Sequence, residues 1–244
     1  SQAGKVAAQI GSCVLKAQVP SGKRGKAGGI KLAANPLDAE TAASEILGLT
    51  IGGYRVEKLL VEASVAIKHE LYAAILNDAA TKGPLLLFSA HGGMDIEEIA
   101  AAHPDGLVRL PIDIRTGLDA EALAAALPQN LPCDRKQLVD VLHRLYQVYA
   151  DNDAELVEIN PLAVVASGAL VALDCKLTID DSALPRREAL AQAGTREQLT
   201  DPADRLQRRA GGLPVEDRGI PADDRRLRPP ARRSVRSRPA QGEA

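Results

Sequence analysis

Short apolar runs and alternating apolar and polar positions predict a mixture of strands and helices along this chain. Alternation is typical of strands, whereas apolar residues spaced three and four apart indicate helices. The clearest helix covers residues 135–149, where Leu138, Leu142 and Leu145 fall on one side. The expected strands are residues 12–19, 30–34, 56–66, 71–77 and 85–89. The expected helices are residues 5–10, 38–47, 95–102, 119–127 and 135–149.

The last strongly patterned segment predicts a β-hairpin. Residues 155–165 and 169–176 have strand character, and Ser167-Gly168 between them suits a turn. Strands intermixed with helices and followed by a hairpin favour an α+β fold. We therefore expect one domain over residues 1–182 and a tail over 183–244, which we expect to be disordered apart from a short helix at 188–193.

Composition and charge narrow the classes of protein. Hydrophobic residues make up 45% of the 244 positions, enough for one or two cores, and the formal net charge of −2 gives no reason to expect a nucleic-acid partner. Three isolated cysteines fit neither a zinc site nor a disulfide framework, which favours a reducing compartment. No apolar run approaches a membrane span and the first residues are no signal peptide, so we expect a cytoplasmic protein.

The net charge conceals an asymmetry between the two ends of the chain. From Arg186 onward there are fourteen arginines and no lysine, together with many prolines. Prolines and clustered like charges oppose a packed core. One interpretation is a basic arm for nucleic acid or an acidic partner; the other is an unstructured end, such as a shifted reading frame would produce.

A glycine-rich, cationic turn over residues 16–29 directly follows the apolar strand Cys13-Val14-Leu15. Glycines let backbone N–H groups approach a phosphate, and lysine and arginine answer its charge. The pattern is not a P-loop, because no Ser or Thr follows a Gly-Lys pair, and no Gly-x-Gly-x-x-Gly occurs. On the residues alone, a phosphate site and a solvated basic turn both remain open.

Five ordered segments resemble the β subunit of succinate–CoA ligases, which are ATP-grasp proteins. They are residues 15–31 with the basic turn, residues 60–72, Phe88-Ser89-Ala90-His91-Gly92-Gly93-Met94-Asp95-Ile96-Glu97, residues 110–118 with Leu110-Pro111-Ile112-Asp113, and Glu158-Ile159-Asn160-Pro161-Leu162 with Leu173-Asp174-Cys175-Lys176. Together they cover about the first three quarters of the chain. The resemblance implies an ATP-grasp fold, present here in part.

The resemblance also assigns site residues to this sequence. Lys16, Lys23, Arg24 and Gly25 match positions that bind the nucleotide phosphates, Glu62 and Val65 match the adenine hinge, and Glu70 matches the carboxylate that accepts from the ribose hydroxyls. Asn160 and Asp174 match the two Mg²⁺ ligands. From the residues alone, these two lie on opposite arms of the hairpin, where their oxygens could face one side; a turn-forming Asn and a solvated Asp remain the alternatives.

Glu158 shares the side of Asn160 by strand alternation, and we assign it a catalytic role: holding a metal-bound water or meeting a partner subunit. The sequence departs from the family at three positions. Relatives usually carry His and Gly where Pro20 and Lys23 stand, and Glu where His91 stands. Proline removes an N–H donor and lysine restricts the backbone angles, so the turn is expected to differ.

The implied reaction converts succinate, CoA and ATP or GTP to succinyl-CoA, nucleoside diphosphate and phosphate. Mg²⁺ is the implied cofactor, and the partner is an α subunit that carries the phosphohistidine and the CoA site. Malate–CoA ligase and a non-catalytic ATP-grasp remnant are the alternatives. Because relatives carry further segments at both ends, including a carboxylate-side domain, we expect this chain alone to form no acyl-CoA.

Overall fold

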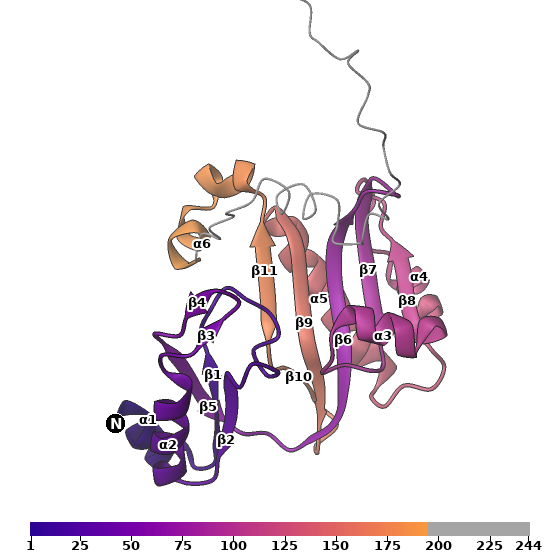
Figure 1. Ribbon diagram of the computed structural model, residues 1–244. Helices are drawn as coiled ribbons and strands as arrows, with labels where there is room; N and C mark the ends of the chain where they lie inside the picture. The colour runs from indigo at the N-terminus through magenta and orange to yellow at the C-terminus, as the bar shows by residue number, and fades with distance from the viewer. Residues whose placement is uncertain (195–244) are drawn as a thin grey trace, which may run out of the picture.

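The structure, a computed structural model, describes residues 1–194, in which two larger antiparallel sheets lie beside each other and β3 and β4 form a separate two-stranded sheet (Figure 1). The smaller sheet has the strand order β2-β1-β5 and carries helices α1 and α2. The larger sheet has the order β10-β9-β6-β7-β8, with β11 also paired to β9. This arrangement confirms the α+β class.

The chain completes the smaller sheet by β5 and forms the larger sheet from β6 onward. The helices are α1 (Gln2–Ile10), α2 (Pro36–Ile46), α3 (Ile96–Ala102), α4 (Ala120–Ala126), α5 (Arg135–Asp151) and α6 (Glu188–Ala193), with 3₁₀ turns η1 (Pro104–Gly106) and η2 (Asp181–Arg186). The strands are β1 (Cys13–Ala17), β2 (Ile30–Ala33), β3 (Thr50–Ile51), β4 (Tyr54–Arg55), β5 (Leu59–Ala63), β6 (Ile67–Asp78), β7 (Gly83–Ser89), β8 (Leu107–Pro111), β9 (Ala154–Val165), β10 (Leu170–Ala172) and β11 (Cys175–Ile179).

The central strand β1 of the smaller sheet separates a core face from a site face. Cys13, Leu15 and Ala17 are fully buried and pack against α1 and α2. Because successive side chains alternate across a strand, Lys16 projects from the opposite face, beside Ile30 of β2 and Leu60 of β5. Strand alternation thus places a lysine on the face that looks toward the larger sheet.

The structure corrects several predicted boundaries in the smaller sheet. Helix α2 begins with Asn35 as its N-cap and Pro36 in the first turn, three residues before the Asp38 start that we expected. The Asn35 side chain accepts from the N–H groups of Leu37 and Asp38, which is the usual way to satisfy a helix start. The expected strand 56–66 is shorter, since only residues 59–63 pair with β1.

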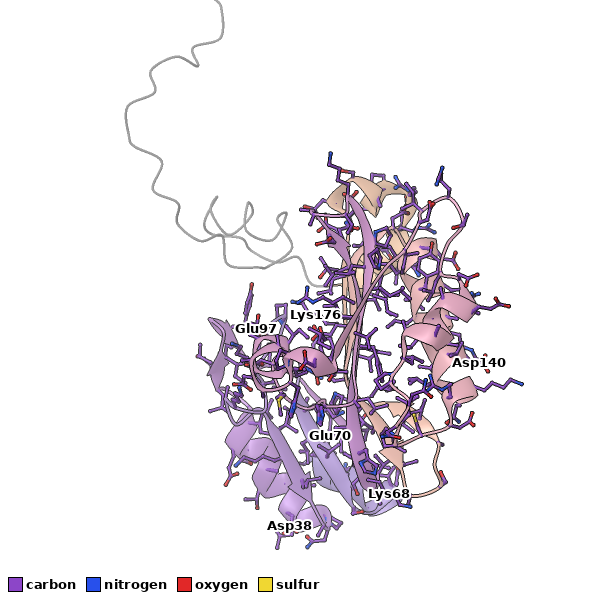
Figure 2. All side chains as sticks on the ribbon, turned by 90° about the vertical axis from the view of Figure 1, so that its right-hand side faces the viewer. Asp38, Lys68, Glu70, Glu97, Asp140 and Lys176 are labelled. Atoms are coloured by element: carbon purple, nitrogen blue, oxygen red, sulfur yellow. The ribbon has the colours of Figure 1, made fainter. Side chains whose placement is uncertain are left out.

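Helices cover both faces of the larger sheet (Figure 2). On one face α5 buries Leu138, Leu142 and Leu145 against β6, β7 and β9, as its periodicity predicted. On the other face α3 buries Ile99 against Tyr72 and neighbouring residues. Figure 2 shows Asp140 of α5 on the first side and Glu70, Glu97 and Lys176 on the other. The second side carries Glu70 of the predicted site.

Strand β9 contains a bulge in the middle of that second face. Leu71 of β6 pairs with Leu162 and Ala73 pairs with Ile159, so Asn160 and Pro161 together lie opposite Tyr72. An extra residue in one strand shifts its alternation and re-aims the side chains around it. As a result, the same core beneath α5 receives side chains on both sides of the bulge, namely Val157, Ile159, Leu162 and Val164.

The last described segment is tied to the turn between α5 and β9. Asp153 accepts hydrogen bonds from Arg186 (3.0 Å) and Arg187 (2.9 Å), and these guanidinium groups lower the pKa of Asp153 to about 2. The predicted helix at 188–193 is confirmed as α6. Arg186 and Arg187, which we assigned to the tail, are therefore tied to Asp153. The disorder expected of 195–244 lies outside the described residues.

Candidate functional site

The basic turn of residues 16–29 lies between the two sheets. Lys16 donates to the Leu173 carbonyl oxygen at 2.6 Å and forms an ion pair with Glu62. Arg24 donates to the Ala17 carbonyl oxygen at 2.8 Å and pairs with the Asp174 carboxylate. Lys16 of β1 and Arg24 of the turn, two predicted phosphate ligands, therefore contact the hairpin of the larger sheet, which carries the predicted metal ligand Asp174.

The remaining cations of the turn pair with the start of α3. Lys26 donates to Asp95 at 3.0 Å and to Glu98 at 2.6 Å, while Lys23 lies 3.4 Å from Asp95. These neighbours lower the pKa of Asp95, chiefly through the Lys26 hydrogen bond. Gly25 lies exposed in the middle of the turn. Every lysine and arginine of the turn thus has a carboxylate partner in the described structure.

Lys23 has a left-handed backbone, with φ of +59°. This conformation favours glycine and is uncommon for a residue with a Cβ. The turn nevertheless closes through its own backbone, since Ala27 N–H donates to the Lys23 carbonyl and Gly29 N–H to the Arg24 carbonyl. The departure from the family pattern at Lys23 therefore falls on a position where lysine is strained.

Asn160 and Asp174 are direct cross-strand neighbours. The hairpin register runs unbroken from Leu170–Val164 to Thr178–Leu156, and it continues through the Asn160 N–H bond to the Asp174 carbonyl at 3.2 Å. Directly opposite residues of an antiparallel pair project to the same face. Asp174 contacts Arg24, whereas the Asn160 amide contacts the loop that follows β7. Their joint binding of a metal remains a prediction.

Glu158 and Tyr72 form a buried polar pair beside these residues. Tyr72 is 2% exposed and hydrogen-bonds to Glu158, whose cross-strand neighbour on β11 is Lys176. Burial raises the pKa of Glu158 most, Lys176 and the Tyr72 hydrogen bond lower it, and Glu97 and Asp174 raise it. Burial also raises the pKa of Tyr72. The net effect favours a protonated Glu158 carboxyl more than in a solvated residue.

Because folding raises the pKa of Glu158, ionising this group costs stability. The cost is absent below the ordinary pKa of a glutamate and grows as the pH rises toward the higher folded value. We therefore expect Glu158→Gln to gain stability relative to the wild type between pH 4 and pH 8. Urea denaturation at several pH values measures this, with exposed Glu57→Gln as the control. A gain that is the same at both pH limits would contradict the expectation.

The predicted adenosine residues lie along β5 and β6. Glu62 is on β5, opposite Val14, and its carboxylate pairs with Lys16. Val65 is 40% exposed in the connection between the strands, and Glu70 lies on the site face of β6. The site thus pairs Lys16 with Glu62 and Arg24 with Asp174.

Sequence reasoning missed several residues that the structure adds. Asp95, which we used only as a helix start, pairs with Lys23 and Lys26. Tyr72 and Lys176 flank Glu158, and strand alternation could have found Lys176 because the hairpin register places it opposite Glu158. The pairing of Lys16 with Glu62 also follows only from the strand register.

Within residues 1–194, no group of three or more His, Cys, Asp or Glu side chains has the arrangement of a metal site. His91 and His103 stack with ring centroids 3.8 Å apart. In the same described range, no helix is both long and apolar enough for a bilayer crossing.

Two facing antiparallel sheets with a basic glycine-rich turn between them define the ATP-grasp class of α+β proteins. Residues 1–164 match the family model described as an ATP-grasp domain, and the chain belongs to that family. The solved structure of ATP citrate lyase from Methanothrix soehngenii aligns with a TM-score of 0.62 at 24% identity, over 85% of this chain and 51% of that one. The expected ATP-grasp fold is confirmed.

A second solved structure and one curated relative extend the comparison. The dinucleotide-forming acetyl-coenzyme A synthetase 1 of Ca. Korarchaeum cryptofilum has a TM-score of 0.59 at 18% identity, over 73% of this chain and 81% of that one. The "Succinate--CoA ligase [ADP-forming] subunit beta" of Herpetosiphon aurantiacus is 42% identical over 86% of this chain. This match confirms the resemblance to β subunits of succinate–CoA ligases, although the chain spans only 56% of that relative's length.

Proposed function

We propose that this chain is the nucleotide-binding part of the β subunit of a succinate–CoA ligase, an acid–thiol ligase. The reaction joins succinate to CoA while ATP or GTP is cleaved to the diphosphate and phosphate. The phosphoryl group passes through a histidine of an α subunit, which also binds CoA. Malate is the alternative acid substrate. The proposal is supported by the 42% identity to an ADP-forming β subunit.

One structural observation carries the proposal: Lys16 donates to the Leu173 carbonyl, and Arg24 forms an ion pair with Asp174. Lys16 is 7% exposed, and burying an ammonium group is costly unless anions or dipoles contact it. A bound triphosphate would take the place of these internal partners. In the proposal Lys16, Lys23, Arg24 and the Gly25 backbone bind phosphates, Glu62 and Val65 hold the adenine, and Glu70 accepts from the ribose hydroxyls.

The side-chain oxygens of Asn160 and Asp174 suit Mg²⁺, and both side chains project from the same face of the hairpin. Asp174 supplies carboxylate oxygens and Asn160 an amide oxygen, and the two are cross-strand neighbours. Asn160 Oδ1 already accepts from Gly93 N–H, but a carbonyl oxygen has a second lone pair. Asn160 and Asp174 would hold the ion, which supplies positive charge to the phosphates during transfer. Glu158 would hold a metal-bound water or meet the partner subunit.

The experiment is a phosphoryl-transfer assay with the full chain. The chain, the α subunit of the same organism and γ-labelled ATP or GTP are mixed with Mg²⁺. We expect an acid-labile, base-stable label on the α subunit, as phosphohistidine requires, and the more efficient nucleotide identifies the natural donor. Absence of label with both nucleotides, while calorimetry shows saturable binding of Mg²⁺-nucleotide, would refute the ligase and leave a nucleotide-binding module.

A further inference from the structure

The loop that follows β7 lies directly on the site face of the larger sheet. A Cβ built on Gly92 would overlap the Leu71 carbonyl group of β6, and a Cβ built on Gly93 would overlap Oε2 of Glu70. The Glu70 carboxylate therefore occupies the space that a side chain at position 93 would fill. The two glycines meet different obstacles: Gly92 faces rigid backbone, whereas Gly93 faces the end of a flexible side chain.

Gly93 also contacts the other strand of the site. Its N–H donates to Asn160 Oδ1 at 2.9 Å, and Asn160 Nδ2 donates to the Met94 carbonyl at 2.9 Å. These two bonds fix the orientation of the Asn160 amide. Gly93 reaches this position with φ of +74°, a left-handed conformation that suits glycine. One residue thus touches Glu70 on β6 and Asn160 on β9.

We propose that Gly93 is a positioning residue for nucleotide recognition. Because glycine has no side chain, the Glu70 carboxylate can occupy the space beside it. Its N–H fixes Asn160 at the same time, so the loop sets the spacing between a ribose-facing carboxylate and a metal-facing amide. This inference rests on the proposed function, in which Glu70 accepts hydrogen bonds from the ribose hydroxyls.

The two neighbouring glycines are expected to respond differently to substitution. In Gly93→Ala the methyl group displaces the Glu70 carboxylate, which can rotate away, so the fold survives while ribose recognition is lost. In Gly92→Ala the methyl group meets the backbone of β6, which cannot rotate away. That variant is therefore expected to unfold at lower denaturant than the wild type, whereas Gly22→Ala, with open space around its Cβ, is not.

The test compares ATP with 2′,3′-dideoxy-ATP, both with Mg²⁺, by calorimetry on the full chain. The wild type is expected to prefer ATP, since only ATP offers hydroxyls to Glu70. Gly93→Ala is expected to weaken ATP binding by about tenfold, the size of one hydrogen bond to a charged group, and to leave dideoxy-ATP unchanged. Gly168→Ala is the matched control, because its φ is +84° and nothing lies within 4 Å of its Cβ.

A double-mutant cycle separates this idea from simple distortion of the site. Glu70→Ala should abolish the preference for ATP, and adding Gly93→Ala to it should change nothing further, since the displaced carboxylate is gone. If Gly93→Ala keeps the preference, or weakens both nucleotides equally, the positioning role is refuted while the proposed function stands. A wild type that binds neither nucleotide would refute the proposed function itself.

Discussion

Lys16→Met is expected to weaken binding of Mg²⁺-ATP by about 10- to 100-fold, which corresponds to one charge-assisted hydrogen bond in a partly desolvated site. Lys16 is 7% exposed and its ammonium group contacts both Glu62 and Leu173, at the point where the two sheets meet. Methionine keeps the volume of the aliphatic stem and removes the charged ammonium group with its hydrogen-bond donors. Calorimetry with Mg²⁺-ATP measures the effect.

The matched control for this variant is Lys31→Met. Lys31 lies on the adjacent strand β2 and is also paired with a glutamate, but that residue is Glu45 of α2 on the helix-covered side. It should therefore leave nucleotide affinity unchanged. If both variants lost affinity to the same extent, the loss would reflect net charge, and the assignment of Lys16 to the phosphates would be wrong.

Asp174→Asn is expected to change the affinity for Mg²⁺-ATP and the affinity for metal-free ATP in different ways. Loss of a carboxylate beside a divalent ion should weaken binding of Mg²⁺-ATP by about tenfold or more, as the charge interaction in a partly exposed site suggests. Metal-free ATP, titrated in EDTA, should bind at least as well as to the wild type, because the variant releases Arg24 from its ion pair with Asp174. Parallel titrations with and without Mg²⁺ measure the difference.

Asp140→Asn serves as the control for Asp174→Asn. Asp140 is exposed on α5, on the opposite side of the larger sheet (Figure 2). It should change neither titration. Equal losses for Asp174→Asn with and without Mg²⁺ would indicate that Asp174 only holds Arg24 in place and binds no metal.

Much of the fold was predictable where a pattern was both long and periodic. The apolar spacing of residues 135–149 predicted α5 with its buried Leu138, Leu142 and Leu145, and alternation in β1 placed Lys16 away from the core. The short ladder of β3 and β4 and the strand β8 were missed. Two paired residues per strand are too few to show alternation, and β8 combines an exposed arginine with a proline.

The start of α2 shows why local boundaries were harder to predict. Asn35, Pro36 and Asp38 all suit a helix start, and the sequence alone does not decide between Asn and Asp as the cap. Asn35 is the cap in the structure, because Pro36 directly after it has no N–H to satisfy and fits the first turn. Asp38 instead accepts from the Asn35 side chain and the Ala34 N–H.

The site was predictable in part from chain spacing. Residues 160 and 174 are centred on Ser167, so a turn there makes them direct neighbours, as the register shows. The bulge opposite Tyr72 was not predictable, because it depends on how β6 and β9 align across about ninety residues. The contact of Glu70 with Gly93 was not predictable either, because no local pattern links the two residues. Likewise the contacts of Lys26 with Asp95 and Glu98 join distant segments that no local pattern links.

The carboxylate partners of Lys16, Lys23, Arg24 and Lys26 have a consequence for the salt dependence of nucleotide binding. A cationic site that faces solvent gathers mobile anions from the buffer and releases them when a phosphate binds, which makes its affinity fall steeply with ionic strength. Here the counterions are covalently part of the chain and cannot diffuse away. Phosphate groups of the nucleotide then replace carboxylates of the chain and release no buffer anions, so added salt should weaken the nucleotide complex only slightly.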